Sequence, residues 1–118
     1  MLKSIKVVLA PITHKDSDVL FGWINDRDLV LLNSNYKPIH EQSHINWFNQ
    51  IQMQNDRVIF CIRLKENDRL IGTCQLYNIH PIYRSAELQI RIGEENARNK
   101  GYGSEAIDLL IHYGFEDL

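Results

Sequence analysis

The sequence Arg98-Asn99-Lys100-Gly101-Tyr102-Gly103 lies between an alternating apolar and polar run at 86–92 and an amphipathic run at 104–118. This order predicts a strand, a glycine-rich turn and a helix. Two glycines separated by one residue let the backbone adopt positive φ and approach a ligand without Cβ atoms in the way. The backbone N–H groups of the turn and of the helix start then converge on one point, which favours an anion.

The basic residues of this turn indicate which anion it binds. Arg98 and Lys100 add two cations, which favours a phosphate or pyrophosphate over a carboxylate. The competing interpretation is an ordinary turn before a helix with two solvated basic residues, and a lone Gly-x-Gly does not separate the two interpretations. The surrounding sequence therefore has to decide between them.

Three kinds of phosphate-binding loop differ in the residues that they require. A P-loop requires Gly-Lys followed by Ser or Thr, and Lys100-Gly101 has the reverse order. Gly101, Gly103 and Ala106 satisfy the dinucleotide pattern G-x-G-x-x-A, but that loop follows a continuously apolar parallel strand and precedes an acidic residue on a second strand. Here the preceding run alternates, and the sequence ends before such a strand. The interpretation of the chain as a dinucleotide-dependent oxidoreductase therefore depends on these three residues alone.

The third kind of loop fits better. Arg98-x-x-Gly101-x-Gly103, following Ala86-Glu87-Leu88-Gln89-Ile90-Arg91-Ile92, resembles the acetyl-CoA loop of the GNAT superfamily of N-acetyltransferases, whose signature is Arg/Gln-x-x-Gly-x-Gly/Ala. Tyr83-Arg84-Ser85-Ala86-Glu87-Leu88 is similar to the branch that contains the ribosomal-protein and spermidine acetyltransferases. The resemblance runs through the whole chain.

The pattern along the chain predicts the order strand, helix, helix, hairpin, strand, glycine loop, helix. We expect strands at 5–12, 57–64, 69–77 and 86–92, with a connection at 78–85. We expect a helix that begins at Asp16-Ser17-Asp18 and stops at 25–28, and further helices at 41–54 and 104–118. Residues 29–32 stay unassigned. In the last helix we expect Ala106, Ile107, Leu110, Ile111, Phe115 and Leu118 to share an apolar face, with Glu105, Asp108 and His112 outward.

The resemblance implies an α/β (α+β) fold, with a mixed, mostly antiparallel sheet flanked by helices. Since 118 residues have room for one core, we expect one domain over residues 1–118. In the family, a further strand, a helix and a terminal pair of strands follow the helix after the loop. The resemblance therefore implies a cofactor-binding part that is incomplete at its C-terminus. The exposed sheet edge and the uncovered face of the last helix would favour a homodimer or a domain swap.

Composition and charge exclude several classes of protein. A net charge of −2 gives no basic stripe for nucleic acid. No apolar run approaches membrane-spanning length, and no secretion signal opens the chain. Cys61 and Cys74 lack metal-ligand spacing, so we expect buried thiols in a reducing compartment, with no metal site and no disulfide. These features predict a cytoplasmic protein.

The chemistry that the resemblance implies is direct transfer of an acetyl group from acetyl-CoA to a primary amine of a small molecule or peptide. Polyamine, amino-sugar nucleotide, protein N-terminus and antibiotic all stay open as acceptors. The alternative is a non-catalytic module that binds CoA or associates with itself. The resemblance implies that the phosphates bind at Arg98, Asn99, Lys100, Gly101, Tyr102, Gly103 and Ser104, and that backbone groups of Arg91, Ile92 and Gly93 pair with the pantetheine arm.

Glu87 is the candidate general base. It lies on the polar side of the strand that enters the loop, and its separation from Gly101 is similar to that of the catalytic glutamate in the histone-acetylating members. The competing interpretation is that Glu87 pairs with Arg84 or Arg91, or binds a cationic substrate without taking its proton. Asn25 and Asp26 follow the first helix and are candidate substrate-binding residues. The competing interpretation is that they only form a stop signal for that helix.

Overall fold

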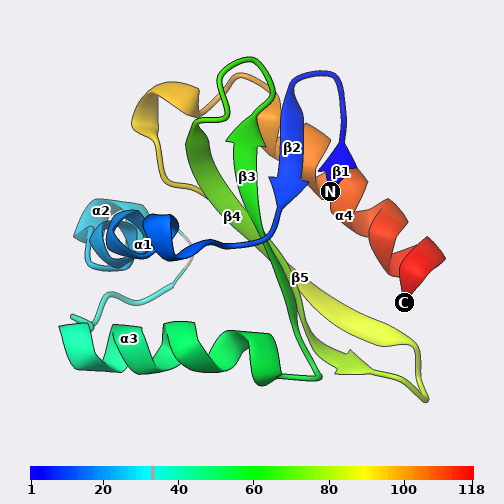
Figure 1. The fold of residues 1–118 in the computed structure, drawn as a ribbon, viewed down its shortest axis with the longest axis horizontal. Coiled ribbons are helices and arrows are strands. Elements are labelled where there is room, and N and C mark those ends of the chain that lie inside the picture. Colours follow the sequence, from blue (N-terminus) through cyan, green and yellow to red (C-terminus); the bar gives the residue numbers. More distant parts are fainter. Residues whose placement is uncertain (33) are drawn as a thin grey trace. The chain divides into compact units, whose positions relative to one another are not determined.

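The computed structural model describes residues 1–32 and 34–118. These residues form two units (Figure 1): a sheet unit made of Met1–Ile12 and Asn55–Leu118, and a helical unit made of Thr13–Gln54.

The sheet unit is built on antiparallel strands in the order β1-β2-β3-β4-β5. Within the described residues β5 pairs with β4 only, so its other side is an open edge of the sheet. The predicted antiparallel sheet with helices is confirmed. The strands are β1 (Leu2–Lys3), β2 (Val7–Ala10), β3 (Val58–Leu64), β4 (Leu70–His80) and β5 (Ser85–Ile92), and the unit also contains the 3-10 turn η3 (Glu95–Ala97) and the helix α4 (Tyr102–Asp117).

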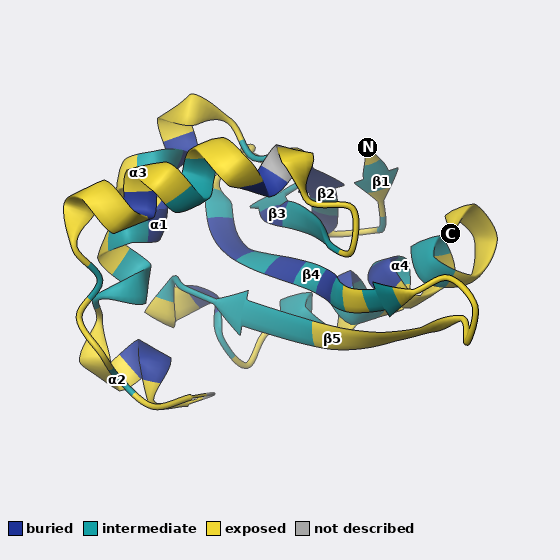
Figure 2. Ribbon diagram, turned by 90° about the horizontal axis from the view of Figure 1, so that it is seen from below, coloured by how far each residue is buried: buried dark blue, intermediate teal, exposed yellow. Residues whose placement is uncertain are grey.

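One face of this sheet packs against α4. The strand register brings Ile62, Gly72 and Ile92 into one row across three strands. Because side chains alternate along a strand, Cys74 and Ile90, two residues further along β4 and β5, lie on the same face as this row. Figure 2 shows buried residues along β4 and α4, whereas the half of β5 next to its turn is exposed. The core contains Val7, Leu9, Ile62, Ile71, Cys74, Leu76, Ala97, Ala106 and Leu110.

A buried histidine connects α1 and α3 within the helical unit. His44 is 6% exposed, and its ring contacts the rings of Phe21 and Trp47. Its Nε2 lies 3.0 Å from the carbonyl oxygen of Ser17. The unit contains η1 (His14–Asp16), α1 (Ser17–Ile24), α2 (Arg27–Val30), α3 (Glu41–Gln50) and η2 (Ile51–Met53).

Several predicted element boundaries are wrong. The first strand is shorter than 5–12 and is preceded by β1, which is too short to show a pattern. The predicted stop at 25–28 is confirmed for α1, which ends at Ile24, but the short helix α2 that follows was not predicted. It begins there because the Asp26 carboxylate accepts a hydrogen bond from the N–H of Leu29 at 3.2 Å. The helix expected at 41–54 ends at Gln50 and continues as a 3-10 turn.

The hairpin of β4 and β5 also differs from the prediction. Paired strand continues to His80 and resumes at Ser85, across the segment predicted as a connection. The register is irregular between Tyr77 and His80, where Asn78 has φ 51°. This irregularity takes up extra residues without ending the strand.

The apolar face predicted for the last helix is divided. Ala106 and Leu110 are fully buried, whereas Phe115 is 85% exposed and Ile111 is 41% exposed. The side chains that complete the buried stripe are Tyr102, Leu109 and Tyr113, which pack against the core. An amphipathic pattern that is apolar over more than half its circumference does not fix which part faces the sheet.

Gly72 is required by the close approach of two strands. A Cβ at this position would lie 2.2 Å from the carbonyl oxygen of Arg91 on β5. The register shifts here, since Ile62 pairs with Gly72 and Arg63 pairs with Leu70, which leaves Ile71 as the extra residue of a bulge. Gly72 thus lies both at a bulge of β4 and at the closest approach of β4 to β5.

Gly72→Ala is therefore expected to destabilise the fold. The added methyl group would have to move backbone atoms of β5, which costs about 1–3 kcal/mol. The urea midpoint should fall, as followed by circular dichroism. Gly22→Ala is the matched control, because nothing lies within 4 Å of a Cβ there and alanine favours the helix. Equal midpoints for Gly72→Ala and the wild type would contradict the prediction.

Candidate functional site

The glycine turn has a left-handed backbone at two positions. Asn99 has φ 62°, and Gly101 has φ 81° and ψ 0° and forms the N-cap of α4. Nothing lies within 4 Å of a Cβ built on Gly101, so the glycine is required for its backbone angle and not for space. The chain turns sharply here and enters α4 at Tyr102.

The first turn of α4 presents unpaired backbone donors. Gly101 has no side chain to cap the helix, and its carbonyl accepts from the N–H of Glu105 at 3.2 Å. For the N–H groups of Tyr102, Gly103 and Ser104, no acceptor is found among residues 1–32 and 34–118. These donors and the positive end of the helix dipole form an anion-binding geometry.

The two cations of the turn differ in how they are held. The Arg98 side chain is half-buried, and its Nε donates to the carbonyl oxygen of Ile92 at 3.1 Å. Lys100 is exposed. Arg98 therefore links the turn to the end of β5, and Lys100 extends into solvent beside the helix start.

The strand register determines which backbone groups of β5 face the open edge. In an antiparallel ladder, successive residues turn their backbone groups alternately toward and away from the partner strand. The N–H of Gly93 donates to the carbonyl oxygen of Ile71 at 2.8 Å, and the carbonyl of Arg91 points toward Gly72. By alternation, Ile92 and Ile90 present their backbone groups to the open edge. Of Arg91, Ile92 and Gly93, the predicted pantetheine partners, only Ile92 has this orientation.

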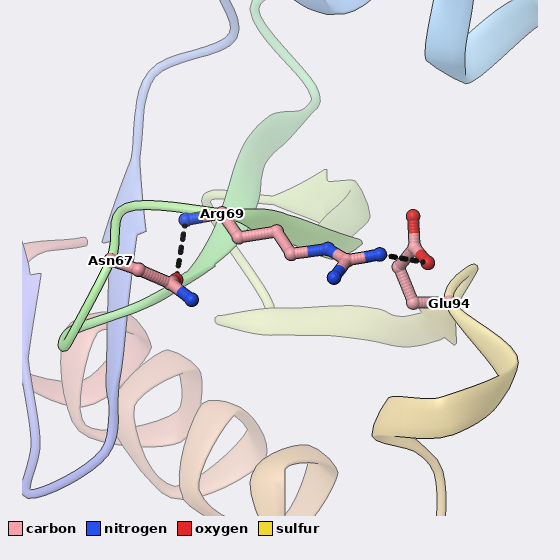
Figure 3. A network of polar contacts seen from close by, with 3 residues as sticks. All are labelled: Asn67, Arg69 and Glu94. Atoms are coloured by element: carbon pink, nitrogen blue, oxygen red, sulfur yellow. Dashed lines mark hydrogen bonds and ion pairs between the residues drawn. The ribbon is translucent and has the colours of Figure 1, made fainter.

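A polar network fixes the segment between β5 and the turn (Figure 3). Arg69 Nη2 lies 2.9 Å from Glu94 Oε2, and the Arg69 N–H donates to the Asn67 side chain at 3.0 Å. The N–H of Glu94 lies 3.3 Å from the carbonyl oxygen of Ile71, and Ala97 is buried. These contacts join the β3–β4 turn to the start of the glycine turn. No sequence signal pointed to Arg69, because its partner is remote along the chain.

Glu87 is exposed on the polar side of the β4–β5 hairpin. The side-chain amide of Asn78 donates a hydrogen bond to Glu87 Oε2. No ion pair with Arg84 or Arg91 is found in the described part of the chain. Gln75 donates to Gln89 in the next row of the hairpin. Gln75 and Asn78 carry no signal along the sequence, since only the register of the hairpin brings them beside β5.

Asn25 and Asp26 lie in the helical unit and have structural partners. Asn25 donates to the carbonyl oxygens of Phe21 and Ile39 and accepts the N–H of Ile39 at 2.8 Å. Asp26 caps α2. Their predicted role in substrate binding remains a prediction.

Metal and thiol chemistry have no evident site in the described residues. No group of three His, Cys, Asp or Glu side chains there could hold a metal ion. Cys61 and Cys74 are both buried thiols, and burial raises the pKa of Cys74 to about 12. None of the described helices has the length and apolar character needed to cross a membrane.

Comparison with known sequences gives one family for almost the whole chain. A family model described as an acetyltransferase (GNAT) domain matches residues 6–118. The chain is 32% identical over 117 residues to an uncharacterized N-acetyltransferase p20 of Bacillus licheniformis, with 96% of this chain covered. The chain spans 65% of the length of that relative. It is 26% identical to an uncharacterized N-acetyltransferase YoaA of Bacillus subtilis, covering 100% of this chain and 68% of that protein.

Solved structures share the fold at lower identity. A spermidine N-acetyltransferase from Vibrio cholerae, in complex with CoA and spermine, superposes with a TM-score of 0.79 at 23% identity, covering 92% of this chain and 63% of that one. A GNAT-family acetyltransferase from Bacillus anthracis gives a TM-score of 0.78 at 20% identity, covering 98% and 66%. At these identities the comparison supports the fold.

Glu105 connects the first turn of α4 to the N-terminus of the chain. Its carboxylate accepts from the hydroxyl of Ser4 and, at 2.9 Å, from the N–H of Lys6. The predicted outward position of Glu105 is therefore wrong, since residues 4–6 pass beside the helix start. The Ser4 hydrogen bond, assisted by the N–H and charge of Lys6, lowers the pKa of Glu105 below its ordinary value of 4.5.

Glu105→Gln is expected to change the pH dependence of stability. Because the folded pKa is lowered, the contribution of Glu105 is present above about pH 4.5 and is lost as the pH falls through the folded pKa. The variant should lose about 0.5–1 kcal/mol near neutral pH and converge with the wild type in acid. Urea midpoints across this range measure the effect. Glu116→Gln, on the exposed last turn, is the control. A constant difference at every pH would contradict the prediction.

Proposed function

We propose, because this chain belongs to the acetyltransferase (GNAT) family, that it forms the acetyl-CoA-binding part of an enzyme that transfers an acetyl group to a primary amine. The observation that carries the proposal is the αL Gly101 at the start of α4, with unpaired N–H groups at 102–104 and two cations beside them. This arrangement fits a diphosphate, because N–H donors at a helix start and two cations in the same turn all favour negative charge.

The open edge of β5 is the second feature that supports this function. The backbone groups of Ile92 face that edge and could pair with an amide-containing arm as a neighbouring strand would. Acetyl-CoA supplies an activated acetyl group, and the residues of this chain align it. Most of the rate enhancement is expected from this alignment and from hydrogen bonding to the developing negative charge.

We propose Glu87 as the general base. An amine acceptor is mostly protonated near neutral pH, so a group must remove its proton before attack. Glu87 is exposed on the polar side of the strand that leads to the turn, and within residues 1–32 and 34–118 the side-chain partner of its carboxylate is Asn78. A neutral amide partner leaves the carboxylate without a competing cation.

A non-catalytic module remains the second candidate, because one specific observation favours it. The open edge of β5 lies in the same unit as exposed apolar side chains of α4, and both features are typical of surfaces that pair with another chain. They would support a homodimer or a domain swap. We also propose a cytoplasmic location, since two buried thiols fit a reducing compartment.

CoA binding tests the cofactor assignment. CoA, but not NAD, is expected to raise the melting temperature of the chain, since a ligand that binds only the folded state stabilises it. Gly101→Ala should lower the affinity of the chain for CoA by about tenfold or more, because alanine is strained at φ 81°. Gly103→Ala should have a smaller effect, because its Cβ would lie at an ordinary 3.6 Å from Ile90 Cδ1. Stabilisation by NAD alone would favour the oxidoreductase.

Glu87→Gln tests the base assignment in the full-length enzyme. Turnover with an amine panel, followed by release of the CoA thiol, should fall by about 100-fold and lose its dependence on a carboxylate pKa. Stabilisation by CoA reports whether the cofactor still binds. Glu66→Gln, exposed in the turn between β3 and β4, is the control. An unchanged rate and pH profile in Glu87→Gln would remove Glu87 as the base, and the absence of transfer to any amine would favour the non-catalytic module.

A further inference from the structure

The face of the β4–β5 hairpin opposite α4 carries rows of polar side chains. Tyr77 pairs with Glu87, Gln75 pairs with Gln89, and Thr73 pairs with Arg91. Directly paired residues point to the same side of a sheet, whereas Ile90 and Ile92, which alternate with them on β5, pack against the core that contains Ala106 and Leu110 of α4. These six side chains therefore share one surface, which we call the polar face.

A second arginine joins the polar face from the start of β3. The guanidinium carbon of Arg57 lies 5.8 Å from the centre of the Tyr77 ring. Val58 pairs with Leu76, so Arg57 belongs to the row of Tyr77 and Glu87. Arg57 and Arg91 thus lie at opposite ends of the three rows, with the Gln75–Gln89 pair between them.

Several polar atoms of this face are buried without a hydrogen bond. They are Nε of Arg57, Nε of Arg91 and Oε1 of Gln75. Buried polar atoms in folded proteins are nearly always paired, so such a cluster is unusual. Neither arginine forms an ion pair within residues 1–32 and 34–118. Both arginine side chains are half-buried, so their guanidinium groups lose part of their hydration, and an anion that fits the planar fork offsets part of that cost.

We propose that the polar face binds an amine acceptor that also carries an anionic group, a carboxylate or a phosphate, with that group on Arg91 or Arg57. This inference rests on the proposed function and specifies the class of its acceptor. The exposed Glu87 carboxylate is a hydrogen-bond acceptor and suits the amine end of such a molecule. The guanidinium groups suit its anionic end.

The charge of the polar face disfavours a polyamine. Arg57 and Arg91 contribute two positive charges, against one negative charge from Glu87. A polyamine carries several positive charges near neutral pH, so it would meet like charge on this face. The spermidine N-acetyltransferases among the structural neighbours share the fold at 23% identity or less, which does not transfer their substrate to this chain.

The test compares matched amines in the full-length protein. The pairs are glycine with glycinamide, and phosphoethanolamine with ethanolamine, with spermidine as the polycationic arm. The ratio of kcat/KM within each pair is compared between variants, because the anionic group also changes the basicity of the amine. The ratio is kcat/KM for the anionic amine divided by kcat/KM for its neutral analogue. We expect this ratio to be about tenfold lower in Arg91→Gln or Arg57→Gln than in the wild type for at least one pair, since the anionic group loses a bidentate partner. Arg84→Gln, an exposed arginine of the β4–β5 turn, should keep the wild-type ratio.

Binding without turnover gives a second readout. N-acetylglycine should raise the melting temperature more than N-acetylglycinamide does, and Arg91→Gln or Arg57→Gln should remove that difference. If Arg91→Gln fails to fold, Arg91→Lys keeps the charge but lacks the planar fork and should retain only part of the preference. Ratios that are unchanged in both glutamine variants, or spermidine as the best acceptor of the wild type, would overturn the proposal. If no amine is acetylated, the proposed function fails, and the melting experiment still decides whether the polar face binds an anion.

Discussion

The antiparallel pairing of β4 with β5 is the constraint on which the rest of the sheet unit depends. The two backbones approach so closely at Gly72 that a Cβ would lie 2.2 Å from the carbonyl oxygen of Arg91. This contact fixes the register. The register in turn decides which backbone groups of β5 face the open edge and which side chains share the polar face. A slip of one residue would exchange the apolar and polar sides of β5.

The same pairing positions the glycine turn. The last residues of β5 are held by the backbone of Ile71 and by the Arg69–Glu94 ion pair, so the chain reaches η3 and the turn from a fixed direction. From there Asn99 and Gly101 adopt left-handed backbone conformations that start α4 with its amides unpaired. Strained backbone of this kind persists where the surrounding structure holds it, and it is typical of binding sites.

Much of the fold could be predicted because its signals are local. The alternation at 86–92, the glycines of the turn and the polar link between β3 and β4 each depend on a few neighbouring residues. The errors occur where a local signal has two meanings, as when Asp26 follows one helix and caps the next. They also occur where remote segments meet. Glu105 bonds to Ser4, and Arg57 joins Tyr77 and Glu87 only through the register of the sheet. For that reason the polar face could not be recognised along the chain.

The hydrogen bond from Arg98 to the carbonyl of Ile92 connects the two halves of the proposed binding region. In that proposal, a phosphate at the turn would compete with the carbonyl for the guanidinium, and a donor at the strand edge would compete with the guanidinium for the carbonyl. Whichever partner arrives first leaves the opposite group without its internal partner. Occupancy at the two places is then thermodynamically linked, and reciprocity requires each to strengthen the other by the same factor. A single molecule that spans both would gain from this cooperativity over its separate fragments.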